Sequence, residues 1–128
     1  VAEADLVVGA VLVTGAVAPR VVSREMVRGM EPGSVMVDIA IDQGGCFETS
    51  RPTTWQEPVF VEEGVAHFCV TNMPGAVPRT ASQAISAAIL PWVDRLASGD
   101  WRGDAALVRG LNVERGELRH PALQSLKL

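Results

Sequence analysis

The sequence contains no tyrosine and only two cysteines among its 128 residues. Two cysteines are too few for a disulfide framework, which favours a reducing compartment and hence a cytoplasmic location. Basic residues are also scarce: 11 Lys and Arg stand against 15 Asp and Glu, and the formal net charge is −4. Nucleic-acid-binding domains present a basic face, and anionic membranes attract polybasic runs. Neither is therefore expected as a partner.

No hydrophobic run is long enough to suggest a membrane protein. The apolar stretch from Leu6 to Ala18 is too short to span a bilayer, and the residues after Val1 lack the basic start and cleavage pattern of a signal peptide. The chain begins directly before a strand-like segment, which indicates a piece of a longer protein; removal of an initiator methionine is the other explanation. With 48% apolar residues, the length suits one domain with a core.

Several signatures of ligand binding are missing: a G-x-G-x-x-G turn, a P-loop, an H-E-x-x-H helix and any Cys/His cluster with metal spacing. We therefore expect no bound metal. His67 falls in a predicted strand and His120 in a polar tail, and we interpret each as structural or solvated, because a lone histidine rarely forms a site. Cys46 is interpreted as a packing residue, because no base is evident beside it.

The most informative stretch runs from Ser34 to Glu48. Its apolar run from Val35 to Ile41 predicts a strand buried on both faces of a parallel sheet. Polar residues then begin abruptly at Asp42 and continue into the pair Gly44–Gly45. Ligands of open α/β sheets bind beyond the carboxyl ends of the strands, so a carboxylate followed by two glycines points to a site there. A strand cap followed by an ordinary turn is the alternative for the same residues.

The surrounding segments predict an α/β fold. The expected elements are a strand at 5–13, a helix at 24–30, and two short strands at 59–61 and 65–70 joined as a hairpin or tight link. Ser23 is a suitable cap for the helix, and Gly9 in the first strand indicates close backbone approach or a bend. Strand, helix and strand within about 35 residues form a βαβ unit.

The longest helix is predicted to start at Thr80, which forms a capping box with Gln83. One face of this helix is apolar at helical spacing and comprises Ile85, Ile89, Trp92, Val93 and Leu96. Pro91 should kink the helix or leave one carbonyl unpaired, and Gly99 should end it. The tail predicts a short helix at 104–109, a hairpin around 115–116 and a short helix after Pro121.

Three segments resemble bacterial alanine dehydrogenases: Val-Asp-Ile-Ala-Ile-Asp-Gln-Gly-Gly-Cys-Phe-Glu at 37–48, Arg-Pro-Thr-Thr at 51–54 and Asn-Met-Pro-Gly-Ala-Val-Pro-Arg-Thr at 72–80. Residues 10–13 and 24–34 fit the same family. The resemblance covers nearly the whole chain, is strongest from Asp5 to Trp101, and becomes loose from Gly103 onward.

The resemblance implies an α/β protein: part of a Rossmann-type parallel NAD-binding sheet, followed by a long helix and a small helical tail of the substrate domain. Residues 1–72 would form the carboxyl-terminal half of the NAD-binding domain, 73–79 an interdomain hinge, and 80–128 a returning segment of the substrate domain. The family oxidatively deaminates L-alanine to pyruvate and ammonia with NAD, reversibly, and assembles as hexamers or smaller homo-oligomers. The glycine-rich turn and the catalytic Lys and His have no counterpart here, so this piece alone is expected to be inactive.

The family's site residues can be placed on matching positions. Those implied to contact NAD are Ala10, Val11 and Leu12 on the dinucleotide path, Ile39 and Asp42 beside the nicotinamide and its ribose, and Val70, Asn72 and Met73 on the other side of the pocket. Asp42 would be the catalytic carboxylate, because one acid–base group must handle protons as the carbinolamine forms or collapses.

Particular residues disfavour two related families, and a non-enzymatic alternative stays open beside this interpretation. Transhydrogenases have a similar NAD-binding domain, but their loop resembles Ala-Ala-Glu-Gln-Gly-Gly-Asn, whereas this chain has Asp42 and Cys46. D-2-hydroxyacid dehydrogenases carry an arginine at the strand end, which suits a substrate carboxylate better than an aspartate does. The alternative from another class is a non-catalytic truncated fragment or interaction module.

Overall fold

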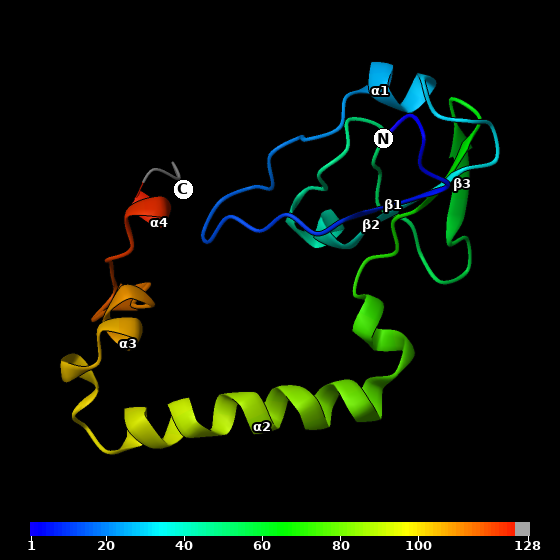
Figure 1. Ribbon diagram of the computed structural model, residues 1–128. Coiled ribbons are helices and arrows are strands. Elements are labelled where there is room, and N and C mark those ends of the chain that lie inside the picture. Colours follow the sequence, from blue (N-terminus) through cyan, green and yellow to red (C-terminus); the bar gives the residue numbers. More distant parts are fainter. Residues whose placement is uncertain (125–128) are drawn as a thin grey trace. The chain divides into compact units, whose positions relative to one another are not determined.

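The computed structural model describes residues 1–124 and divides the chain into two compact units, with the boundary between Met73 and Pro74. The first unit contains β1 (Leu6–Gly9), α1 (Arg24–Arg28), β2 (Val35–Asp38), the 3-10 helix η1 (Ile39–Gln43), β3 (Val59–Glu62) and β4 (Val65–Phe68) (Figure 1). The second contains α2 (Pro78–Ala97), the 3-10 helix η3 (Trp101–Gly103), α3 (Ala105–Arg109), β5 (Val113–Glu114), β6 (Glu117–Leu118) and α4 (Pro121–Gln124). The short 3-10 helix η2 (Met73–Ala76) lies at the boundary.

The first unit is built on one sheet in the order β1-β2-β4-β3. β1 and β4 both pair with β2 in parallel, so that Val7, Met36 and His67 lie side by side across the sheet. β3 pairs with β4 in the antiparallel sense, and the link between them turns through Glu63 and Gly64, whose φ angles are 54° and 79°. The predicted parallel sheet and the predicted hairpin are both confirmed.

The βαβ connection also follows the sequence. Ser23 caps α1, and its hydroxyl accepts a hydrogen bond from the Met26 N–H at 3.2 Å. The helix is two residues shorter than predicted, because Gly29 takes the C-cap position after Arg28. Val27 on this helix is fully buried, so α1 closes one face of the sheet with its single buried side chain.

The predicted strands at 5–13 and 35–41 are too long. β1 ends at Gly9 because its partner β2 ends at Asp38, which is the last pair of the ladder. Ile39 to Gln43 form η1 instead, and Gly44 ends it with a φ of 97°. Ile41 is buried with Phe60 and Cys69, so the apolar pattern that suggested a continuing strand reflects burial of a helical turn.

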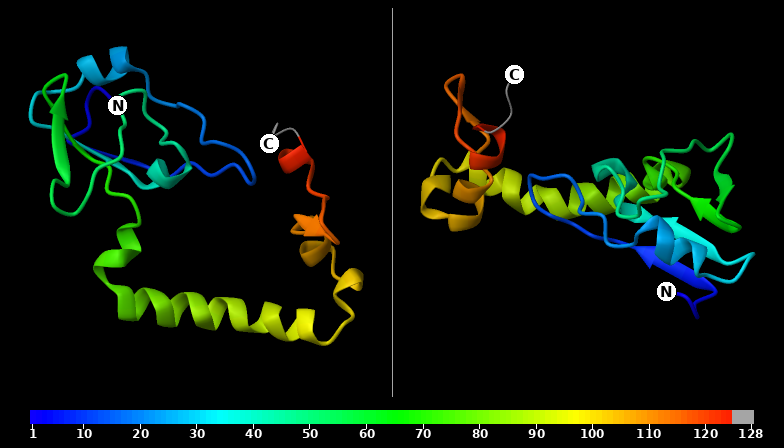
Figure 2. Two further views of the ribbon diagram at one scale, coloured as in Figure 1. Left: turned by 180° about the vertical axis from the view of Figure 1, so that it is seen from behind. Right: turned by 90° about the horizontal axis from the view of Figure 1, so that it is seen from above.

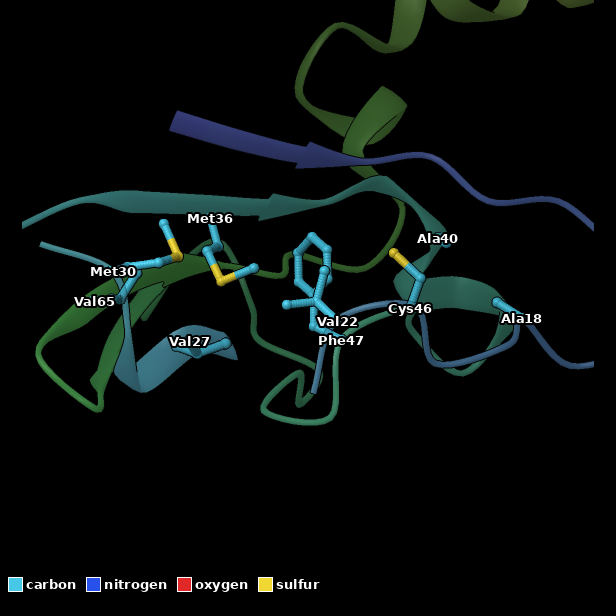
Figure 3. Close-up of a cluster of buried hydrophobic side chains, with 9 residues drawn as sticks. All are labelled: Ala18, Val22, Val27, Met30, Met36, Ala40, Cys46, Phe47 and Val65. Atoms are coloured by element: carbon cyan, nitrogen blue, oxygen red, sulfur yellow. The ribbon is translucent and has the colours of Figure 1, made fainter. Parts of the chain in front are cut away.

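The main core lies on the α1 side of the sheet. Figure 3 shows its side chains gathered below the β2 ribbon, beside α1. The cluster comprises Ala18, Val22, Val27, Met30, Met36, Ala40, Cys46, Phe47 and Val65. The opposite face of the sheet carries Val8, Val59 and Val61, which remain 53%, 52% and 69% exposed. One face of the sheet is therefore packed and the other presents apolar side chains to solvent.

In the second unit, α2 is the longest helix, as predicted, and it continues through Pro91 (Figure 2). The predicted capping box is wrong: α2 starts at Pro78, and Val77 in the N-cap position makes no side-chain cap hydrogen bond. Proline suits the first helical position because its missing N–H would have no partner there. No residue of α2 is buried, so the predicted apolar face is present but uncovered.

The small elements of the tail agree with the sequence. Asp104 caps α3 by accepting hydrogen bonds from the N–H groups of Ala106 and Leu107. β5 and β6 form the predicted hairpin, and α4 begins at Pro121. Within residues 1–124, no helix combines the length and the hydropathy needed to cross a membrane.

Gly9 provides a test of this packing. A Cβ atom at Gly9 would lie 2.3 Å from Cys46 Sγ and 2.6 Å from Phe47 Cζ. Gly9→Ala should therefore destabilise the protein by about 1–3 kcal/mol, the usual cost of overpacking, as a lower urea midpoint. Gly29→Ala is the matched control, because its nearest atom would be Met26 O at an ordinary 3.5 Å. Equal midpoints for the two variants would contradict this packing.

Candidate functional site

The parallel pairing brings three segments to one edge of the sheet. β1, β2 and β4 are adjacent and run in the same direction, so their carboxyl ends lie together. The segments that leave these ends are 10–12, 39–43 and 70–73, and all the predicted site residues fall within them. In open α/β sheets this edge is where ligands bind.

Asp42 links two of these segments. The sequence predicted Asp42 at the end of a strand. In the structure β2 ends earlier, and Asp42 lies about one turn further along, on η1, where it is exposed. Its carboxylate accepts the backbone N–H of Asn72, at 3.2 Å to Oδ1 and 3.1 Å to Oδ2. Asn72 adopts a φ of 50°, a left-handed conformation that asparagine tolerates better than most residues. The carboxylate is thus held against the segment after β4.

The predicted cofactor-contacting residues differ in their exposure. Leu12 and Ile39 are 68% and 52% exposed, and Ala10 is exposed as well. Val11 is half-buried against the main core. Val70 is fully buried, backbone included, so it offers no surface to a ligand in this structure. Met73 is half-buried.

A second aspartate at this edge of the sheet is buried, and it was not among the site residues predicted from the sequence. Asp38, the last residue of β2, is 0% exposed. Its Oδ2 accepts the N–H of Cys46 at 2.8 Å and the hydroxyl of Ser50 at 2.5 Å. A charged residue inside the apolar run Val35–Ile41 was the available signal, because charged side chains are rarely buried without partners.

The two glycines after η1 are required by the protein's own packing. Gly44 and Gly45 have φ angles of 97° and 79°. A Cβ atom at Gly45 would lie 2.9 Å from Asp38 Oδ2 and 3.0 Å from Arg20 Nη1. Gly44 and Gly45 therefore form a left-handed turn at the end of η1, and the space beside the Gly45 Cα is filled by side chains of this chain.

His67 and the two cysteines are interior residues. The His67 ring is fully buried, with Nδ1 2.9 Å from the Val65 carbonyl oxygen and Nε2 2.7 Å from Thr49 Oγ1. It stacks on Phe60 at a centroid distance of 4.9 Å. Cys46 and Cys69 are both fully buried, and burial raises the pKa of each thiol. The structure thus confirms the packing role inferred for Cys46.

No metal-binding cluster occurs in the part of the chain that the structure describes. Among residues 1–124, no group of three or more His, Cys, Asp and Glu side chains is placed to hold a metal ion.

Comparison with known proteins identifies the family. Residues 1–121 match the family described as alanine dehydrogenase/PNT, C-terminal domain. This chain belongs to that family. The alanine dehydrogenase of Halomonas elongata is 54% identical over an aligned length of 127 residues, and the match covers 96% of this chain and 34% of that protein. The alanine dehydrogenase of Mycolicibacterium smegmatis is 51% identical over an aligned length of 127 residues, and the match again covers 96% of this chain and 34% of that protein.

Solved structures of the family share the fold. An L-alanine dehydrogenase superposes with a TM-score of 0.78 at 51% identity, covering 97% of this chain and 35% of that one. A transhydrogenase from Sinorhizobium meliloti superposes with a TM-score of 0.70 at 30% identity, covering 94% of this chain and 33% of that one. The chain thus spans about a third of the length of the curated relatives it matches.

The buried Cys46 thiol predicts an alkaline loss of stability. Burial first, and then the neighbouring Asp38 carboxylate, raise the pKa of Cys46 from 9.0 to about 11. Because the folded pKa is the higher one, the stabilisation is complete below pH 9 and is lost as the pH rises from 9 to about 11.

The loss should be on the order of 2 kcal/mol, measured as the free energy of unfolding in urea at a series of pH values. Cys46→Ala is the control, because it lacks the thiol and should lose less stability over the same range. Parallel pH profiles for the two proteins would show that Cys46 does not contribute.

Proposed function

We propose that this chain is the carboxyl-terminal part of an NAD-dependent alanine dehydrogenase, which oxidatively deaminates L-alanine to pyruvate and ammonia, reversibly. The support is the family membership, together with 54% identity to the Halomonas elongata alanine dehydrogenase over nearly the whole chain. The observation that carries the proposal is the exposed Asp42 carboxylate at the carboxyl edge of three parallel strands, held by the Asn72 N–H.

Asp42 is the proposed acid–base group. Asp42 is exposed, and within residues 1–124 its two oxygens share one donor, the Asn72 N–H, so lone pairs remain for a substrate or a water molecule. Formation and collapse of a carbinolamine both require proton transfer, and a positioned carboxylate can take up and return that proton. Asp42 would act together with residues that lie outside this chain.

The same edge fits a dinucleotide. Leu12 and Ile39 expose large apolar surfaces there, 68% and 52% of each residue, and a flat ring resting on them would remove that surface from water. Ala10, Val11, Asn72 and Met73 would complete the NAD contacts, and Val70, which is fully buried, would support them from the interior. NAD, when bound, supplies the hydride acceptor, and these residues would fix the position of its nicotinamide ring.

We propose the following division of the chain. Residues 1–72 are the carboxyl-terminal half of the NAD-binding domain, 73–79 an interdomain hinge, and 80–128 a returning segment of the substrate domain. The hinge contains Gly75, which can change φ and ψ at low cost, whereas Pro74 and Pro78 stiffen its ends. The piece alone is proposed to be inactive; the whole protein is proposed to be a cytoplasmic homo-oligomer, hexameric as in the full-length family.

A transhydrogenase-like NAD-binding domain is the second candidate. The observation in its favour is the superposition on the Sinorhizobium meliloti transhydrogenase at a TM-score of 0.70. Asp42 and Cys46 favour the dehydrogenase, because the loop typical of transhydrogenases has Glu and Asn at these two positions. The activity assay below separates the two, since only the dehydrogenase forms pyruvate from L-alanine.

The role of Asp42 can be tested in the full-length protein that carries this segment. Asp42→Asn should lower kcat for L-alanine oxidation by about two to four orders of magnitude, the usual contribution of one acid–base group. The Kd for NAD should change little, because the amide has nearly the same shape and can still accept the Asn72 N–H. Steady-state kinetics at saturating alanine and NAD titration measure the two quantities.

Glu48→Gln is the matched control for this experiment. Glu48 is another exposed carboxylate of the same loop, and it accepts the Arg24 N–H at 2.7 Å, away from Asn72. This variant should keep wild-type kcat. An Asp42→Asn enzyme within about threefold of wild type would refute the role, because that is under roughly 1 kcal/mol of barrier.

A further inference from the structure

Asp38 is a buried carboxylate held by hydrogen-bond donors. It is 0% exposed, and none of the ion pairs found within residues 1–124 includes it. Besides the Cys46 N–H and the Ser50 hydroxyl on Oδ2, its Oδ1 faces the Cys46 Sγ–H at 3.4 Å. Burying a carboxylate costs free energy unless hydrogen-bond donors replace its water, so these donors offset the cost of burying Asp38.

The donors come from the far side of the loop that carries Asp42. Asp38 precedes η1, and Cys46 follows the two glycines that end it. The hydrogen bond from the Cys46 N–H to the Asp38 carboxylate therefore connects the residues on either side of 39–45, so that this segment forms a hydrogen-bonded ring. Inside the ring, Gly44 N–H donates to the Ile41 carbonyl at 3.0 Å and Gly45 N–H to the Ala40 carbonyl at 3.0 Å.

The side chain of Asp38 does not cap η1, although it occupies the N-cap position. An aspartate in that position ordinarily accepts an N–H of the first helical turn. Here the carboxylate reaches instead to Cys46 and Ser50. The closure of the ring and the Gly44–Gly45 turn are therefore among the contacts that hold the 3-10 helix.

We propose that Asp38 is a positioning residue: its buried carboxylate closes the 39–45 loop and thereby fixes the direction in which Asp42 faces its site. The proposal rests on the proposed function for the catalytic consequence, but its structural part stands independently. A displacement of about 1 Å at a catalytic group can cost about 10²-fold in rate. The anchor is therefore expected to affect turnover without contacting substrate.

Two substitutions separate geometry from charge. Asp38→Ala removes both anchoring oxygens. Asp38→Asn can place its carbonyl oxygen at the Oδ2 position, where it accepts from Cys46 N–H and Ser50, while its amide group faces the weakly accepting Cys46 sulfur. A positioning role predicts that Asp38→Ala lowers kcat by about 10²-fold, whereas Asp38→Asn stays within about threefold of wild type.

A double-mutant cycle with Asp42 distinguishes positioning from general loss of structure. If Asp38 acts through Asp42, then Asp38→Ala should lower kcat far less in an Asp42→Asn background than in the wild type, because residues acting as a unit are non-additive. Val27→Ala, in the core on α1, is the control for lost stability and should leave kcat unchanged in both backgrounds. Multiplicative losses from Asp38→Ala and Asp42→Asn would overturn the proposal.

Hydrogen–deuterium exchange of the full-length protein tests the structural part without using catalysis. Asp38→Ala should accelerate exchange in peptides covering 39–46 and the Asn72 amide, which is bonded to Asp42. The Ala66 amide, bonded to the Ser34 carbonyl at 2.9 Å, should exchange as in the wild type. Unchanged exchange at 39–46 would refute the anchor even if Asp42→Asn is inactive. Faster exchange with an unaffected Asp42→Asn enzyme would instead refute the proposed catalytic role.

Discussion

Parallel pairing of β1, β2 and β4 is the constraint on which the candidate site depends. Parallel neighbours end at the same edge of a sheet, so the pairing collects three segments that are distant in sequence. Antiparallel pairing of β2 with either neighbour would send that segment to the opposite edge. The contact between Asp42 and Asn72, which are 30 residues apart, exists only because β2 and β4 run the same way.

Two aspartates four residues apart have opposite environments at this edge. Asp38 is buried and its oxygens are occupied by donors of the loop, so it can stabilise structure but cannot reach a ligand. Asp42 is exposed and, within residues 1–124, accepts a hydrogen bond only from the Asn72 N–H, so its oxygens are open to a bound molecule. The 3-10 helix between them produces this division, because it turns the chain away from the strand direction after Asp38.

Packing is unequally distributed between the two units. The first unit has a compact core between α1 and the sheet, whereas α2 has no buried residue within residues 1–124. Its apolar face, including Ile85 and Leu96 at 60% and 50% exposure, has the pattern of a helix that packs on a partner. This agrees with a chain that spans about a third of its relatives' length.

The sequence by itself determined most of the element types and the parallel sheet, and it predicted the site segments. Buried parallel strands, the Ser23 cap and the Gly44–Gly45 turn are local signals, and each depends on residues close together in the chain. The tertiary structure decided where the strands end, because β1 stops where β2 offers no further partner, and apolar residues such as Ile41 are equally suited to a buried strand or a buried turn. It also decided that Asp38 is interior and Asp42 exposed, since burial depends on Cys46, Ser50 and Asn72, which approach these carboxylates only after the chain has folded.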